Sequence, residues 1–199
     1  MSCVVGIVDN EAVWMAADSL NSIEGVEGWC TASSNPKIIR KDDVLIGYVG
    51  SARLGDIIAN DVAIPLKTEY FIANLVDILS EEFGFNDCLD SSGTFDGALL
   101  VGYVHKTPQL VMIGSDFGTL KPSSGYIAMG SGSPHAMGAL CATDGWDAKT
   151  RLHAAMRAAQ EHSPYVRCPF IYETVALPAR TGQASVALVE MWEGHPTVG

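Results

Sequence analysis

Residues 2–18 read SCVVGIVDNEAVWMAAD, two short apolar runs separated by three polar residues. The runs Val4–Val8 and Ala12–Ala17 have the length of β-strands, and the Asp, Asn and Glu between them are turn-forming residues. We therefore predict a β-hairpin, with Ser2 two residues before the start of its first strand and Asp18 immediately after its second. A chain terminus that leads straight into a core strand can hold a side chain in one orientation, whereas a frayed terminus cannot.

Beyond this hairpin, the apolar periodicity predicts further strands and two pairs of helices. The expected strands are 37–40 and 44–49 around the turn Lys41-Asp42-Asp43, 96–105 and 109–114 around the turn Lys106-Thr107-Pro108, 126–129, 170–176 and 184–192. The expected helices begin after the capping residues Ser51 and Thr68, at His135 and after Asp147, and they end near Val62, at Gly84, near Ala142 and at His162. Residues 21–35 are polar and contain glycine, which indicates a loop or an irregular hairpin.

This order of elements favours an α+β fold. Helices that come in pairs between runs of antiparallel strands do not make βαβ units, which excludes a doubly wound parallel sheet. They suit two stacked antiparallel sheets, each covered on its outer face by a helix pair. No repeat, linker or low-complexity tract interrupts the chain, so we expect residues 1–199 to form a single domain.

The composition excludes several classes of protein. The 12 Lys and Arg against 23 Asp and Glu give a net charge of −11, and no basic cluster is present to bind nucleic acid or an anionic membrane. With 48% hydrophobic residues the chain is too apolar to be disordered. Only 18% of residues are charged and the mean hydropathy is +0.19, so we expect some apolar surface to be covered by subunit contacts.

Targeting segments and metal motifs are not evident in the sequence. There is no run of 18 apolar residues and no basic segment at the N-terminus, so we expect a cytoplasmic protein without a membrane span. The five cysteines include no CxxC pair, and the five histidines include no HxxxH or HExxH spacing. We therefore expect reduced thiols, no metal site and no cofactor.

Ser2 is the first candidate for chemistry. Trimming of Met1 would leave Ser2 with both a hydroxyl nucleophile and an α-amine, whose ordinary pKa of about 7.7–8.0 suits a general base at neutral pH. Such a residue can be activated by its own amine. Asp18 and Lys37 lie at the ends of predicted strands; a lysine near a hydroxyl stabilises its alkoxide, and a carboxylate keeps that lysine protonated.

Five segments then carry a resemblance to a known family. They are Ser2–Val8, Trp14–Ser19, Asn35–Ile38, Gly47–Ser51 and Ala128–Pro134. In this order they resemble the opening strands, the lysine-bearing strand and the two glycine-containing turns of proteasome β-type subunits, including the HslV-like members. Those proteins are N-terminal nucleophile (Ntn) hydrolases, so the resemblance implies their four-layer αββα sandwich.

The resemblance also implies roles for five residues. Ser2 would be the nucleophile and its amine the base, Asp18 and Lys37 would tune its hydroxyl, the amide of Gly50 would serve the oxyanion hole, and Ser131 would hydrogen-bond near the N-terminal amine. The implied activity is cleavage of peptide bonds, without a cofactor or metal. The implied partners are a peptide or unfolded-protein substrate and identical subunits in a ring; an ATP-dependent unfoldase partner is left unspecified.

The sequence departs from the family pattern at three places. Ser2 stands where active members usually have threonine, and Lys37 comes a few residues late, consistent with a longer loop over 25–34. The late Asp and Ser of the family have no clear match in 161–167, where Ser163 is the nearest substitute. Two alternatives therefore stay open: an inactive ring-forming scaffold, and a peptide ligase that passes the acyl group to an amine.

Overall fold

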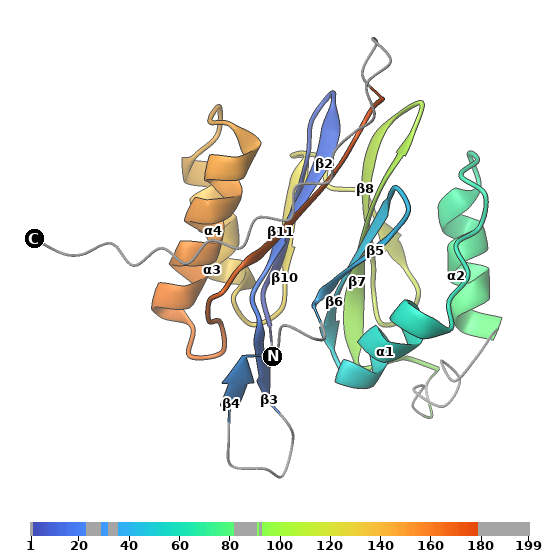
Figure 1. The fold of residues 1–199 in the computed structure, drawn as a ribbon, viewed down its shortest axis with the longest axis horizontal. Helices are drawn as coiled ribbons and strands as arrows, with labels where there is room; N and C mark the ends of the chain where they lie inside the picture. Colours follow the sequence, from blue (N-terminus) through green and yellow to red (C-terminus); the bar gives the residue numbers. More distant parts are fainter. Residues whose placement is uncertain (1, 23–28, 32–35, 82–90, 92, 179–199) are drawn as a thin grey trace, which may run out of the picture.

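The computed structural model describes residues 2–22, 29–31, 36–81, 91 and 93–178. Two β-sheets pack face to face, with helices α1 and α2 outside one sheet and α3 and α4 outside the other (Figure 1). The strands are β1 Val4–Val8, β2 Ala12–Ala17, β3 Leu20–Ser22, β4 Trp29–Thr31, β5 Ile38–Lys41, β6 Val44–Gly50, β7 Gly97–His105, β8 Thr107–Ile113, β9 Thr119–Leu120, β10 Tyr126–Met129 and β11 Ile171–Ala176. The α+β fold of four αββα layers is therefore confirmed.

The sheet that carries the N-terminus has the order β10-β1-β2-β11 and is antiparallel throughout. Its central hairpin pairs Val4 with Ala17 and Val8 with Val13, as predicted from the apolar runs. This register places Ser2 and Asp18 at the same end of the hairpin. Beyond Asp18, the short strands β3 and β4 form a separate hairpin within the stretch expected to be a loop or an irregular hairpin.

The second sheet has the order β5-β6-β7-β8-β9. Its strand β6 is almost wholly buried, as its apolar sequence predicts. The predicted hairpin is present, but its turn is shorter than the expected Lys106-Thr107-Pro108: Thr107 pairs with His105, and Pro108 pairs with Val104, inside the β7–β8 ladder. Lys106 alone makes the reversal because it adopts a φ of 60°. Strand β9, only two residues long, was not predicted.

The helices are α1 Ala52–Asn60, α2 Phe71–Glu81, α3 Ser133–Ala142 and α4 Ala148–His162. The expected caps are present at two of them. The Ser51 hydroxyl accepts from the Arg53 amide, and the Asp147 carboxylate accepts from the Thr150 amide. Thr68 caps the turn before α2, and α3 begins two residues earlier than expected. The expected helix end at 83–84 and the expected strand 184–192 lie outside the described residues.

Three apolar clusters hold the layers together. One packs the helices α1 and α2 on the second sheet, and another packs α3 and α4 on the first. The third fills the space between the sheets and includes Val4, Met15, Leu45 and Leu100, all of them fully buried. The end of the β1–β2 hairpin is therefore fixed on both faces, which positions Ser2 and Asp18.

Candidate active site

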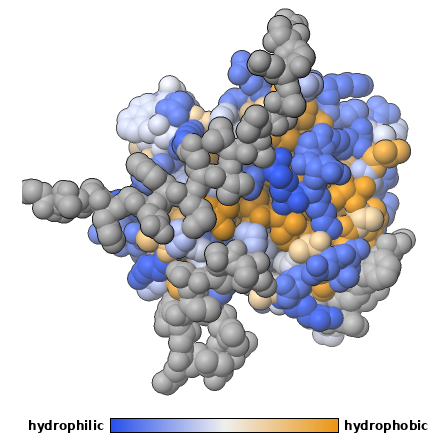
Figure 2. Space-filling view, viewed as in Figure 1, coloured by the Kyte–Doolittle hydropathy of each residue, from blue (hydrophilic) through white to orange (hydrophobic). Residues whose placement is uncertain are grey.

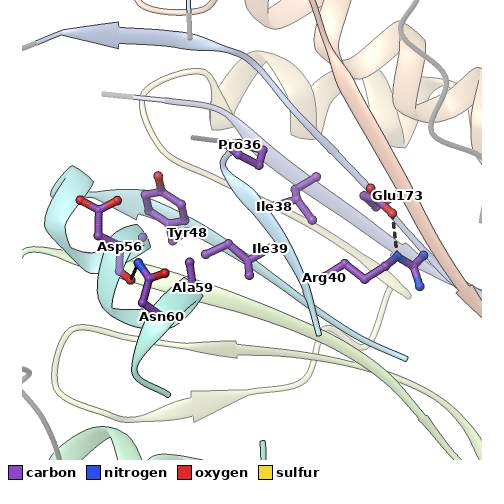
Figure 3. A pocket seen from close by; sticks show the side chains of 10 residues that line it. Pro36, Ile38, Ile39, Arg40, Tyr48, Asp56, Ala59, Asn60 and Glu173 are labelled. Atoms are coloured by element: carbon purple, nitrogen blue, oxygen red, sulfur yellow. Dashed lines mark hydrogen bonds and ion pairs between the residues drawn. The ribbon is translucent and has the colours of Figure 1, made fainter. Parts of the chain in front are cut away.

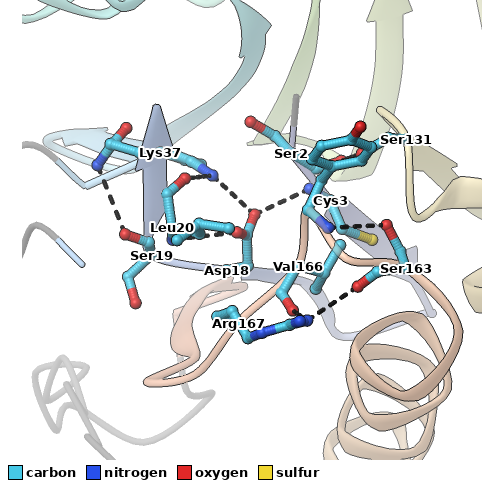
Figure 4. Close-up of polar contacts among 12 residues, drawn as sticks. Ser2, Cys3, Asp18, Ser19, Leu20, Lys37, Ser131, Ser163, Val166 and Arg167 are labelled. Carbon is cyan, nitrogen blue, oxygen red and sulfur yellow. Dashed lines mark hydrogen bonds and ion pairs between the residues drawn. The ribbon is translucent and has the colours of Figure 1, made fainter. Parts of the chain in front are cut away.

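Asp18 is a fully buried carboxylate with three hydrogen-bond donors. Its Oδ1 accepts from the Cys3 amide at 2.9 Å and from the Lys37 ammonium at 2.8 Å, and its Oδ2 accepts from the Leu20 amide at 3.1 Å. Figure 4 shows Asp18 between Lys37 and the backbone of Cys3. A buried charge is tolerated when it is paired and hydrogen-bonded in this way. The predicted pair of Asp18 and Lys37 is therefore brought together.

Lys37 immediately precedes β5 and is nearly as buried as Asp18, at 3% exposure against 0%. Besides the Asp18 carboxylate, its Nζ donates to the Leu20 carbonyl at 2.6 Å. Burial lowers the pKa of Lys37, and the attraction of Asp18 acts in the opposite direction. The same Asp18 oxygen, Oδ1, binds both the Lys37 ammonium and the amide of Cys3. Because Cys3 follows Ser2 directly, Asp18 links Lys37 to the backbone next to Ser2.

Ser2 is 4% exposed, and its backbone is held by the turn before α3. Its carbonyl oxygen accepts from the Gly132 amide and from the Ser131 hydroxyl, both at 3.3 Å. Gly130 permits this approach: its φ is 88°, and a Cβ added to it would lie 2.2 Å from the Ser2 carbonyl oxygen. Ser131 thus lies beside Ser2 as expected, but the bond observed is to the Ser2 carbonyl.

Gly50 ends strand β6 at the edge of this region. Its φ of 107° is left-handed, and a Cβ there would lie 2.1 Å from the Asp96 carbonyl oxygen, so the position requires glycine. The preceding Val49 side chain would lie 3.2 Å from a Cβ on Gly130. The end of β6 therefore lies near the point where Gly130 contacts Ser2. Gly50, the last residue of β6, is in the same region.

The segment 163–167, which follows α4, connects the end of this helix to the site through hydrogen bonds. Ser163 is buried, and its carbonyl accepts from the Arg167 guanidinium at 2.9 Å. The Arg167 carbonyl in turn accepts from the amide of Ser19, the residue after Asp18. Figure 4 shows the Arg167 guanidinium against the Ser163 carbonyl. The sequence did not indicate roles for Arg167 and Ser19, because their link joins residues far apart in the chain.

Cys3 does not qualify as a nucleophile in this arrangement. Its side chain is fully buried, and burial, with a smaller contribution from Asp18, raises the pKa of its thiol from 9.0 to about 12. The reactive form of cysteine is the thiolate, which is negligible at neutral pH with such a pKa. The hydroxyl of Ser2 is therefore the better candidate.

A groove of about 490 Å³ runs beside the strand that follows Lys37. It lies between α1, β5 and β11, and its floor is apolar, with Ile38 and Ile39 (Figure 3). One end carries the ion pair of Arg40 and Glu173, whose Nε and Oε2 are 3.0 Å apart. In Figure 2, apolar side chains are visible in the middle of this face between hydrophilic regions.

Within the described part of the chain, no three His, Cys, Asp or Glu side chains are grouped so that they could bind a metal ion together. Among the described helices, none is both long and apolar enough to cross a bilayer. Cys3, Cys141 and Cys168 are free thiols.

Several solved structures resemble this one over most of the chain. The BPH protein of Thiobacillus denitrificans in complex with epoxomicin is 23% identical with a TM-score of 0.70, and the same protein without that compound is 25% identical with a TM-score of 0.67. Eukaryotic HslV from Trypanosoma brucei is 20% identical with a TM-score of 0.67. Each match covers 88% of this chain and 99% of the other. No protein-family model and no curated protein matches the sequence.

The fold and its neighbours define the structural class. Two antiparallel sheets between two helix pairs form the αββα sandwich of the Ntn hydrolases. Within that class, the similar structures are of the HslV and proteasome type, which supports the resemblance to proteasome β-subunits that the sequence motifs predict.

Proposed function

We propose that this protein is a proteasome-type N-terminal peptidase that cleaves peptide bonds through an acyl-enzyme on Ser2 after Met1 is removed. One observation carries the proposal: Asp18 Oδ1 joins the Lys37 ammonium, at 2.8 Å, to the amide of the residue after Ser2, at 2.9 Å. The likeness to HslV and proteasome-type structures supports a peptidase-type function on this fold.

In the proposed reaction, the Ser2 hydroxyl attacks the carbonyl carbon of the scissile amide. The α-amine of Ser2 takes the hydroxyl proton and passes it to the leaving amine, so the C–N bond breaks and an ester forms. The positive charge of Lys37 stabilises the developing alkoxide, and the Gly50 amide stabilises the oxyanion. Water then attacks the ester by the same proton route, which releases the acid and restores Ser2.

The substrate we propose is a peptide or an unfolded segment of protein. The groove along β5 is lined by Pro36 and Ile38, the residues on either side of Lys37, has the volume of a small-ligand pocket, and would receive a substrate side chain on its apolar floor. Its lining also carries the ion pair of Arg40 with Glu173 and the carboxylate of Asp56.

The test combines intact-mass analysis with peptide turnover. We expect mature protein without Met1, a covalent adduct of an electrophilic inhibitor on residue 2, and turnover that Ser2→Ala abolishes. Epoxomicin, present in the structure of the T. denitrificans BPH protein, is the first inhibitor to try. Ser124→Ala is the matched control, because Ser124 is exposed and its hydroxyl bonds the Tyr126 carbonyl away from the site.

Three results would favour the alternatives. A retained Met1 with no adduct would exclude the Ser2 mechanism, and correct processing without turnover would favour a ring-forming scaffold. Products that carry an added amine acceptor would favour a peptide ligase. Sedimentation would test the ring: we expect a mass that is a multiple of 21.1 kDa, and a monomer at micromolar concentration would contradict it.

A further inference from the structure

Two histidines far apart in the sequence lie in contact at one end of the α3–α4 pair. His135 is in the first turn of α3, and His162 is the last residue of α4, 27 positions later. Their ring centroids are 5.2 Å apart and the ring planes are inclined by 38°. Neither ring is hydrogen-bonded to another of the described residues, so their nitrogens are open to a different ligand.

The spacing of the rings suits a shared metal ion. A Zn–N bond of about 2.0–2.1 Å, with the ring centre roughly 1 Å further on, puts the centroids of two histidines on one tetrahedral ion about 5 Å apart. His162 is exposed, and rotation about the last torsion of a histidine side chain meets only a broad, shallow barrier. Either ring nitrogen of His162 can therefore be turned toward the ion.

We propose that His135 and His162 form a binding site for a divalent transition-metal ion such as Zn²⁺, with water in the remaining positions. Imidazole is a preferred ligand of these ions, and the net charge of −11 attracts cations to the molecule. The described residues supply no third side-chain ligand, so the site is open rather than a closed structural site.

The ion would join two segments that hold the candidate active site. Just before His135, the Gly132 amide binds the Ser2 carbonyl; just after His162, the Ser163 carbonyl binds Arg167. A metal ion would therefore fix the start of α3 to the end of α4 beside Ser2. The site is independent of the proposed peptidase activity, because it rests only on the contact of the two rings.

The test is calorimetric titration of the metal-free full chain with ZnCl₂, with melting curves in Zn²⁺ and in EDTA. We expect saturable binding and a higher melting temperature in Zn²⁺. His162→Ala and His135→Asn should each weaken that binding at least about tenfold, since each removes one of two ligands. His105→Ala is the matched control, because His105 lies at the end of β7 in the other sheet, and it should bind Zn²⁺ as the unmodified chain does.

The readout does not depend on catalysis. Melting of each variant in EDTA shows whether it folds, and His162→Gln, at an exposed position, repeats the test with a polar side chain. Absence of saturable Zn²⁺ binding, or binding that survives both substitutions of His162, would overturn the proposal. A peptidase assay without turnover would overturn the proposed function and leave this site unaffected.

Discussion

The stability of the buried Asp18 charge depends on Lys37, because Lys37 is its only side-chain donor among the described residues. Lys37→Met would keep much of the apolar stem and leave the carboxylate with two amide donors. Loss of one partner of a buried ion pair costs about 3–5 kcal/mol, so we expect a destabilisation of that order in urea unfolding. Asp18→Asn combined with Lys37→Met should cost less than the sum of the single changes; additive costs would contradict the pairing.

Gly130 is expected to tolerate no side chain. Its φ is 88°, and a Cβ would lie 2.2 Å from the Ser2 carbonyl oxygen, so Gly130→Ala must move Ser2 or the turn. We expect a loss of roughly 2–3 kcal/mol in unfolding free energy and a severe loss of peptide turnover. Gly138→Ala is the control: it lies within α3 with no atom within 4 Å of the added Cβ, and it should stabilise by about 0.5–1 kcal/mol. Equal effects of the two substitutions would refute the steric argument.

Because of Cys3, the free energy of unfolding is expected to fall at alkaline pH. The pKa of its thiol is about 12 in the folded protein and 9.0 ordinarily, so above pH 9 the unfolded chain holds fewer protons than the folded one. Stability from this group is therefore complete below pH 9 and falls as pH rises, by about 1.4 kcal/mol per pH unit. The lowered pKa of Lys37 has the opposite effect: below pH 10.5 it makes stability rise with pH. Because Lys37 is present in both the unmodified chain and Cys3→Ala, comparison of the two proteins isolates the effect of the thiol.

The measurement is the difference in unfolding free energy between the unmodified chain and Cys3→Ala from pH 8 to pH 10.5. The difference should be constant at the lower end and should shrink above pH 9. A difference that does not vary with pH would show that the thiol is not protected by burial.

Among the elements, helix α1 begins directly after the candidate site residue Gly50. Its cap, Ser51, follows Gly50 directly, and the Ser51 hydroxyl accepts from the Arg53 amide at 3.2 Å. Ser51→Ala should cost about 0.5–2 kcal/mol, whereas Ser51→Thr retains a capping oxygen and should cost less. Thermal unfolding of both variants tests this. Equal losses in the two would show that the hydroxyl is not a cap.

The sequence predicts elements well where the local signal is complete. The hairpin of β1 and β2, strand β10 and the Asp147 cap of α4 each follow from a short apolar run or a single polar residue, and all are confirmed. The turn after β7 was predicted at the right place but two residues too long, because Lys106 alone takes a left-handed conformation without the usual Gly or Asn. Strand β9 is too short to show any periodicity.

The candidate site was predicted only in part, for a related reason. Ser2, Asp18 and Lys37 could be named because they flank predicted strands and match family motifs, and the structure brings Asp18 and Lys37 into contact. The link from Arg167 to Ser19 and the contact of His135 with His162 depend on how α4 packs. Sequence spacing does not predict contacts between residues that only the tertiary fold brings together.

On the scale of the whole molecule, the two sheets are joined by a polar link as well as by their apolar faces. Arg40 in β5 forms an ion pair with Glu173 in β11 at 3.0 Å (Figure 3). Arg40 also donates to the carbonyls of Thr174 and Asp42. The side chains of Arg40 and Glu173 are 28% and 11% exposed, so water and salt screen the pair only partly. The link therefore contributes to holding the sheet edges together.

A double-mutant cycle separates the parts of this link. Arg40→Ala removes the ion pair and both carbonyl bonds, so it should cost about 1.5–3 kcal/mol, more than Glu173→Ala, after which Arg40 still binds Thr174. The coupling between the two substitutions should be at least about 0.5 kcal/mol and should fall only slightly in high salt, because the pair is partly buried. Urea unfolding at low and high salt measures it. Equal single-variant costs with no coupling would mean that the pair of Arg40 and Glu173 does not help to join the sheets, since the cycle would then detect no contribution from these two charges.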